Sequence, residues 1–89
     1  MRRVRVVIYG FVQGVFFRHN TKKLAEELNV RGFVRNINDE VEAVFEGSDD
    51  AVEKMLSFCR KGPWGALVKK VDVKEEKYKG EFKVFDLLR

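Results

Sequence analysis

Residues 10–18, Gly-Phe-Val-Gln-Gly-Val-Phe-Phe-Arg, are the part of the chain whose types and spacing are best suited to chemistry. A glycine at position 14 allows a tight turn in which successive backbone N–H groups approach a ligand closely. Arg18 follows, and its planar guanidinium can hold two oxygens of a phosphate at once. The segment therefore indicates an anion site, and an ordinary strand-to-helix turn is the alternative interpretation.

Two elements must position this segment, a strand before it and a helix after it. Apolar and polar residues alternate over residues 4–9, which predicts a half-buried strand that Gly10 ends. Asn20 is a good N-cap, and the apolar residues that follow it at helical spacing predict a helix from about that point. The segment then lies at the amino end of a helix, where the helix dipole favours an anion.

The rest of the chain predicts a tight hairpin, a second helix and two further strands. The hairpin turns at Asn38-Asp39, and the second helix carries acidic residues in its first turn, where the helix dipole favours them. The expected elements are strands at 33–37, 41–46, 67–76 and 82–87, and a helix from a cap at Ser48 to a stop at Gly62.

The order of these elements is strand–helix–strand–strand–helix–strand, with one short strand added at the C-terminal end. This order is typical of the ferredoxin-like split βαβ fold. We therefore expect an α+β protein in which one antiparallel sheet carries both helices on a single face. With 89 residues and no linker or low-complexity segment, the chain is expected to form a single domain, 1–89.

This topology brings a second residue, Asn36, toward the candidate anion site. The first two strands are expected to run parallel across a right-handed crossover, so both end on the same edge of the sheet. By strand parity Asn36 shares a face with Val34, and if that face carries the helices, its amide lies beside the loop. An amide there could orient a water for attack on a bound phosphate. The alternative is that Asn36 simply begins the hairpin turn.

The composition limits the kinds of site that the chain can build. Cys59 is the only cysteine, which excludes an intramolecular disulfide and a cysteine-built metal site. With His19 as the only histidine, no zinc site of the usual kind can be assembled. We expect no metal and no cofactor. Cys59 continues the apolar stripe of the second helix and is interpreted as a core residue, and His19 as a solvent-facing one.

The net charge of +4 suits an anionic ligand, but the basic residues are spread along the chain and interleaved with acidic ones. Nucleic-acid-binding proteins more often gather basic residues on one face. No apolar stretch approaches transmembrane length, and the apolar run before Gly10 is too short for a signal-peptide core. We expect a monomeric, cytoplasmic protein that binds neither nucleic acid nor membrane.

Two motifs at a defined separation resemble those of the acylphosphatase family. Residues 9–18 resemble the family signature G-x-V-Q-G-V-x-F-R. Residues 32–36, Gly-Phe-Val-Arg-Asn, resemble the second motif, in which an aromatic-Val-basic-Asn run follows a glycine. The resemblance continues through residues 44–47 and Gly62-Pro63 to the C-terminal strand, and so covers nearly the whole chain.

The resemblance implies a metal-independent enzyme that hydrolyses small acyl phosphates to carboxylate and phosphate. It implies that Arg18 binds the substrate phosphate and that Asn36 positions the attacking water. It also implies that backbone amides of the intervening loop cradle the phosphate. The loop residues assigned to this cradle are Val12, Gln13, Gly14, Val15, Phe16 and Phe17.

The chain departs from the family pattern at two places. Phe33 stands where a tryptophan is common, and the turn at 37–40 lacks the usual glycine and looks shorter. Because Asn36 enters that turn, the direction of its amide depends on the turn's geometry.

Two other functions stay open. One is a non-catalytic domain that binds acyl or carbamoyl phosphate. The other is an RNA-binding module, since RNA-recognition motifs share this element order and residues 31–34 superficially resemble the start of their aromatic motif. That match ends at Arg35-Asn36, and it falls on the second strand instead of the third.

Overall fold

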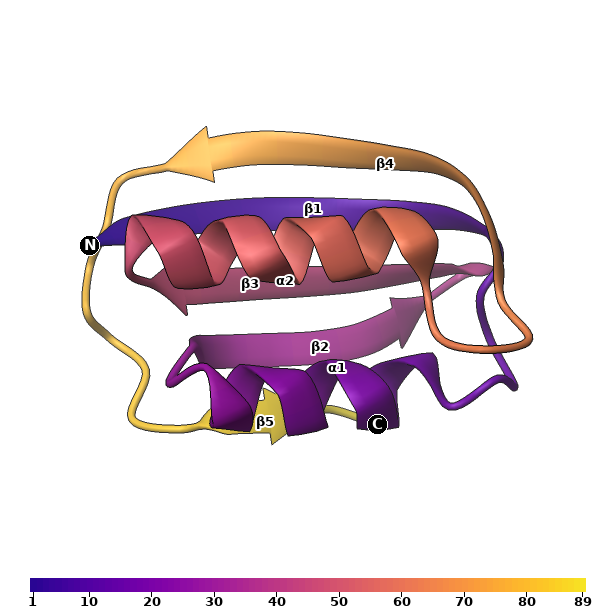
Figure 1. Cartoon of the computed structure of the whole chain (residues 1–89), viewed down its shortest axis with the longest axis horizontal. Helices are drawn as coiled ribbons and strands as arrows, with labels where there is room; N and C mark the ends of the chain where they lie inside the picture. The colour runs from indigo at the N-terminus through magenta and orange to yellow at the C-terminus, as the bar shows by residue number, and fades with distance from the viewer.

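The computed structural model describes all 89 residues and contains five strands and two helices. The elements are β1 (Arg2–Phe11), α1 (Phe17–Glu27), β2 (Arg31–Ile37), β3 (Glu40–Gly47), α2 (Asp49–Lys61), β4 (Leu67–Glu76) and β5 (Phe85–Leu87). Both helices pack on the same face of one sheet, so the molecule has two layers (Figure 1). The ferredoxin-like α+β fold predicted from the sequence is confirmed.

The sheet has the strand order β4-β1-β3-β2-β5. β1 pairs antiparallel with β3 and β4, and β2 pairs antiparallel with β3. The short β5 pairs parallel with β2, so the sheet is mixed instead of wholly antiparallel. The reason is the connection 77–84, which carries the chain from the β4 edge across to the opposite edge (Figure 1).

The core lies between the sheet and the helices, as the strand and helix periodicities predict. Alternate residues of the central strands face it, and the apolar stripe of α2 meets them from the other side. Cys59 belongs to this stripe and is fully buried, as predicted. The main contributors are Val4, Val6, Ile8, Val34, Val41, Ala43, Phe45, Val52, Met55 and Leu56.

Ion pairs cross the opposite face of the sheet. Arg3 is almost fully buried and contacts the carboxylates of Glu46, Glu76 and Glu81. Glu46 also accepts the backbone N–H groups of Lys79 and Gly80, at 3.1 and 3.3 Å. These bonds hold the connection 77–84 against the end of β3.

The last strand is shorter than expected, because residues 82–84 belong to this connection. Phe82 packs its ring edge-on against Phe33, with centroids 6.0 Å apart, and lies under the guanidinium of Arg3 at 5.2 Å. This packing keeps Phe82 in the connection, so β5 begins at Phe85. The alternation of apolar and polar residues in the sequence does not indicate such a contact.

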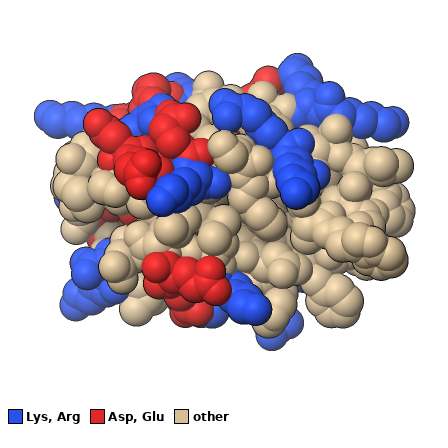
Figure 2. Space-filling view, in the orientation of Figure 1, with Lys and Arg blue, Asp and Glu red and all other residues tan.

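Charged residues on the helical face are intermixed. Lys and Arg lie next to Asp and Glu over much of this face, whereas the end that carries the β1–α1 and α2–β4 loops shows few charged side chains (Figure 2). Exposed apolar residues occur at this end, among them Phe16 and Trp64. Neither α1 nor α2 has the length and apolar character of a membrane-spanning helix.

Candidate functional site

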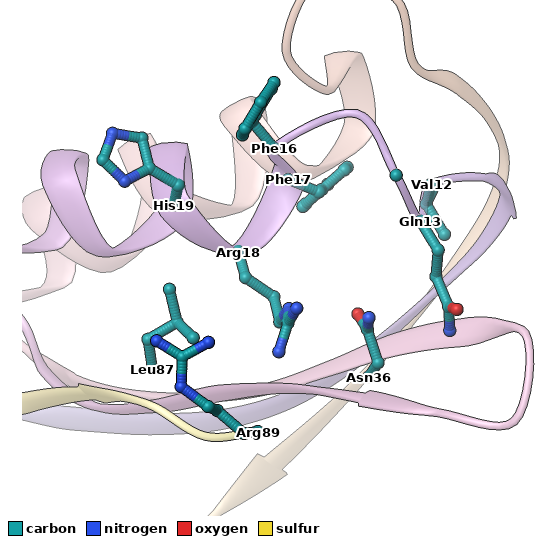
Figure 3. Close-up of a pocket in the computed structure, with 10 residues that line it drawn as sticks. Val12, Gln13, Phe16, Phe17, Arg18, His19, Asn36, Leu87 and Arg89 are labelled. Atoms are coloured by element: carbon teal, nitrogen blue, oxygen red, sulfur yellow. The ribbon is translucent and has the colours of Figure 1, made fainter.

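A cavity of about 370 Å³ opens where the β1–α1 loop, the first turn of α1, the end of β2 and the C-terminal segment meet. Its volume lies within the range of small-molecule sites, about 300–1,000 Å³. Arg18 and Asn36 both line it, from elements that are separate in sequence (Figure 3). The lining residues are Val12, Gln13, Gly14, Phe16, Phe17, Arg18, His19, Asn36, Leu87 and Arg89. Val15, the remaining residue of the expected cradle, packs against the core instead.

The loop between β1 and α1 lines this cavity and contains unpartnered backbone donors. Gly14 and Phe16 have positive φ angles of 77° and 59°, so the backbone alternates in handedness along the loop. None of the N–H groups of residues 12–16 donates a hydrogen bond within the protein. N–H groups left free in such a loop converge on an anion, and the amino end of α1 reinforces the positive potential.

The helix that follows begins at Phe17, three residues before the predicted cap at Asn20. Phe16 is the N-cap residue, and its left-handed conformation ends the loop early. Asn20 therefore lies inside the first turn, where its side chain donates to the Phe16 carbonyl oxygen at 2.9 Å. The earlier start places Arg18 in the first turn of the helix, close to the free N–H groups of the loop.

Arg18 is half-buried and forms no ion pair with a carboxylate. Its Nη1 donates to the carbonyl oxygen of Leu88 at 2.9 Å, which fixes one side of the guanidinium. The other groups point toward the space shared with Asn36 (Figure 3). No Asp or Glu lines the cavity, so the positive charge of Arg18 is available to an anionic ligand.

Asn36 lies at the end of β2, paired with Val41 of β3. It shares the helix-bearing face of the sheet with Val34, as strand parity predicts. Its side chain points toward Arg18 and forms no hydrogen bond within the protein. Beyond Val34 only β3 pairs with this part of β2, because the β5 ladder ends there.

Gln13 uses its side chain in a way that the sequence did not indicate. Its Nε2 donates to the backbone carbonyl oxygens of Asn38 and Glu40, at 2.8 and 3.0 Å. The turn between β2 and β3 consists of Asn38 and Asp39 alone, so one oxygen lies within the turn and the other on the first residue of β3. The turn is tight, as predicted, and Asn38 adopts the left-handed conformation with φ 50°.

Two residues of the cavity were missed in the sequence, Leu87 and Arg89. Both come from the C-terminal segment, and Arg89 is exposed and forms no ion pair. The signal that could have found them is topological: a last strand parallel to β2 must end on the same edge as Asn36. His19 is exposed at the border of the cavity, and its ring points away from Arg18 and Asn36 (Figure 3).

The chain matches known proteins over its whole length. The family model described as acylphosphatase matches residues 4–87. An acylphosphatase of Syntrophus aciditrophicus is 51% identical over 89 residues, which cover 99% of this chain and 93% of that protein. The crystal structure of an acylphosphatase from Bacillus subtilis superposes with a TM-score of 0.94 at 27% identity, with all of both chains covered.

A larger protein contains the same fold as one of its parts. The crystal structure of full-length HypF in its phosphate- and nucleotide-bound form matches with a TM-score of 0.91 and 26% identity. The match covers 99% of this chain but only 12% of that protein. Domains of this shape therefore occur both alone and within longer chains.

Proposed function

Since this chain belongs to the acylphosphatase family and is an enzyme of that family, we propose that it hydrolyses the carboxyl–phosphate bond of acyl phosphates, with Arg18, the 12–17 loop and Asn36 as its working parts. The observation that carries the proposal is the convergence of unpartnered loop N–H groups, an unpaired arginine and an unbonded amide on one cavity. Each of these three parts has a distinct task.

The loop and Arg18 bind the phosphate. Free N–H groups on residues 12–16 donate to the phosphoryl oxygens, and the guanidinium of Arg18 donates from the opposite side. Each hydrogen bond to a charged group contributes about 1.5–3 kcal/mol, so several of them hold a phosphate dianion firmly. Because these donors are already in place, they also stabilise the charge that spreads over the phosphoryl oxygens in the transition state.

Asn36 orients the attacking water. Its amide oxygen accepts a hydrogen bond from the water, which directs a lone pair of the water oxygen toward phosphorus. The new O–P bond forms as the bond from phosphorus to the acyl oxygen breaks, and its electron pair leaves on the carboxylate. The water's second proton passes to a phosphoryl oxygen of the substrate, because no Asp or Glu side chain lines the cavity to accept it.

The chemistry needs little else, since a carboxylate is a good leaving group. Positioning of reactants and charge stabilisation together supply most of the required acceleration. No three His, Cys, Asp or Glu side chains of the structure gather in a way that could hold a metal ion. We therefore propose a metal-independent reaction without a covalent intermediate.

The deciding experiment measures phosphate release from acetyl phosphate with and without a chelator. The purified chain should turn over in both conditions, and Arg18→Ala should lower kcat/KM by about a thousandfold or more, because phosphate binding and transition-state stabilisation are lost together. Arg31→Ala, at an exposed arginine at the far end of β2, is the matched control and should leave turnover unchanged.

Asn36→Ala tests the second part of the proposal. It should lower kcat by about a hundredfold while the inhibition constant of inorganic phosphate changes little, because phosphate binding does not involve the water. The opposite pattern would assign Asn36 to binding. A folded wild-type chain that binds phosphate without turnover would support the non-catalytic domain instead.

The cytoplasmic location, the monomeric state and the action of residues 1–89 as one domain stay predictions. Light scattering of the purified protein at several concentrations should give the mass of one chain, 10.4 kDa. A mass that doubles with concentration would contradict the monomer.

A further inference from the structure

We infer that Gln13 is a positioning residue: its side chain fastens the β2–β3 turn to the phosphate loop and so fixes the direction of Asn36. The inference rests on the function proposed above and adds a residue whose side chain acts away from the phosphate. It starts from the two hydrogen bonds that Gln13 Nε2 donates to Asn38 and Glu40.

Asn36 needs such support because little else holds its end of β2. The parallel ladder with β5 covers only residues 32–34 of β2, so beyond Val34 one edge of the strand is unpaired. On the other edge the ladder with β3 ends at the pair Ile37–Glu40, one residue past Asn36. Asn36 is itself exposed, so packing does not fix its side chain.

The Gln13 amide supplies hydrogen bonds to the end of the β2–β3 hairpin, where no strand pairs with the outer edge of β2. Its two acceptors lie on both sides of Asp39, so the two bonds hold the turn and the start of β3 together. The side chain points from the loop toward the hairpin and lines the same cavity as Arg18 and Asn36 (Figure 3). The backbone of Gln13 still belongs to the loop with free N–H groups.

One residue thus joins the phosphate-binding loop to the strand that carries Asn36. Its backbone is part of the phosphate cradle and its side chain sets the distance from that cradle to the amide of Asn36. A fixed distance matters, because an in-line attack tolerates a displacement of the water of well under about 1 Å. Loss of the bonds should therefore affect the chemical step more than phosphate binding.

The test is a double-mutant cycle between Gln13→Met and Asn36→Ala. Methionine keeps the length of glutamine but cannot donate a hydrogen bond. Gln13→Met should lower kcat for acetyl phosphate about tenfold and change the inhibition constant of inorganic phosphate less than twofold. In the Asn36→Ala background the same substitution should lower kcat no further, because the group that it positions is already gone.

Asn20→Ala is the matched control, since it removes another side chain–backbone bond from the same loop, at 2.9 Å, without touching the hairpin. Its kcat should stay within twofold of the wild type. If Gln13→Met does not fold, Gln13→Asn serves in its place, because it keeps the amide but is one methylene too short to reach both carbonyl oxygens.

The outcomes separate this inference from the proposed function. Equal losses of kcat in both backgrounds, or a rise in the phosphate inhibition constant that matches the loss of kcat, would overturn the positioning role. A wild-type chain without turnover, or an Asn36→Ala variant with full kcat, would instead overturn the function on which the inference rests.

Discussion

Arg18 and Arg89 place two guanidinium groups at one cavity that no Asp or Glu side chain lines. Arg18 is half-buried in the first turn of α1 and has a fixed partner in the Leu88 carbonyl oxygen, whereas Arg89 is exposed and unpaired. The two charges should therefore act differently. In the proposed mechanism Arg18 binds the phosphate, and Arg89 should add to the potential that attracts the anionic substrate.

Arg89→Ala should accordingly raise KM for acetyl phosphate about two- to fivefold and leave kcat nearly unchanged, because an exposed charge interaction contributes about 0.2–1 kcal/mol. The effect should shrink when salt is added, since mobile ions screen exposed charges. Steady-state kinetics at low and high ionic strength measure both points, with Arg89→Lys as the charge-preserving control. A KM that is independent of the charge at this position would refute the prediction.

Cys59 has no part in the chemistry, and its surroundings explain why. Burial raises the pKa of the Cys59 thiol to about 12. The thiolate, which is the reactive form, is therefore absent at neutral pH. An aromatic disulfide reagent at about pH 8 should leave the native protein unmodified and titrate one thiol after denaturation. Ser57→Cys, exposed on the same helix, is the positive control, and equal reaction rates at the two positions would show that Cys59 is accessible.

Among the elements, those with a clear periodicity could be predicted closely. The second helix begins at Asp49 after the Ser48 cap and ends at Lys61 before the Gly62 cap, and β4 covers residues 67–76 as expected. The Ser48 hydroxyl accepts the N–H of Ala51 at 3.2 Å, which is the bond that the cap residue predicts. In these elements the local pattern and the tertiary packing favour the same structure.

The start of α1 and the side chain of Gln13 could not be predicted in this way. Phe16 adopts a left-handed conformation that is typical of glycine, and its residue type gives no indication of this. The sequence therefore indicated Asn20 as the cap instead. The bonds of Gln13 join residues 25 and 27 positions apart, and a contact of that range depends on how the loop meets the hairpin. Motifs and topology could place Arg18 and Asn36 together, but the fixation of the turn is visible only in the structure.

Two glycines show how differently the strand and the loop tolerate a side chain. At Gly32, in β2, an added methyl carbon would lie 1.9 Å from the Val44 carbonyl oxygen, whereas at Gly14 nothing lies within 4 Å. Gly32→Ala should lower the free energy of unfolding by about 3 kcal/mol or more, because the β2–β3 ladder must shift. Gly14→Ala should cost about 1–2 kcal/mol, from its left-handed φ angle alone.

Urea unfolding followed by circular dichroism measures both values. After correction for the folded fraction, Gly14→Ala should lower turnover more than Gly32→Ala, because Gly14 lies in the loop whose free N–H groups are proposed to bind the phosphate. Equal stability losses would show that the sheet relaxes around Gly32 without cost.

At the scale of the whole molecule, ion pairs between side chains join the strands on the face of the sheet away from the helices. Arg3 and Arg5 both donate to Glu76, at 2.9 and 3.0 Å, and thereby join β1 to the edge strand β4. These hydrogen bonds, first that from Arg3 and then that from Arg5, lower the pKa of Glu76 below its ordinary value of 4.5. The charged carboxylate is therefore favoured in the folded state.

This shift gives the stability a pH dependence of known sign. A carboxyl group with a lowered pKa in the folded state stabilises fully above its ordinary pKa, and the contribution is lost as the pH falls through the lowered value. The unfolding temperature should thus fall as the pH is reduced from about 6 to about 3. Glu76→Gln should start from a lower unfolding temperature and show a shallower decline. A decline as steep as that of the wild type would assign the acid sensitivity to other carboxylates.

β5 is the smallest element of the fold, with three residues, yet the residue that follows it contacts Arg18. Leu88 donates its N–H to Val34 at 2.9 Å and offers its carbonyl oxygen to Arg18. A segment secured by so few backbone bonds opens locally at a lower free energy than the core, and each opening releases the arginine from its partner. On heating, the enzyme should therefore lose activity at a lower temperature than that at which the sheet unfolds. Local opening of the last strand sets the first temperature, and unfolding of the core sets the second.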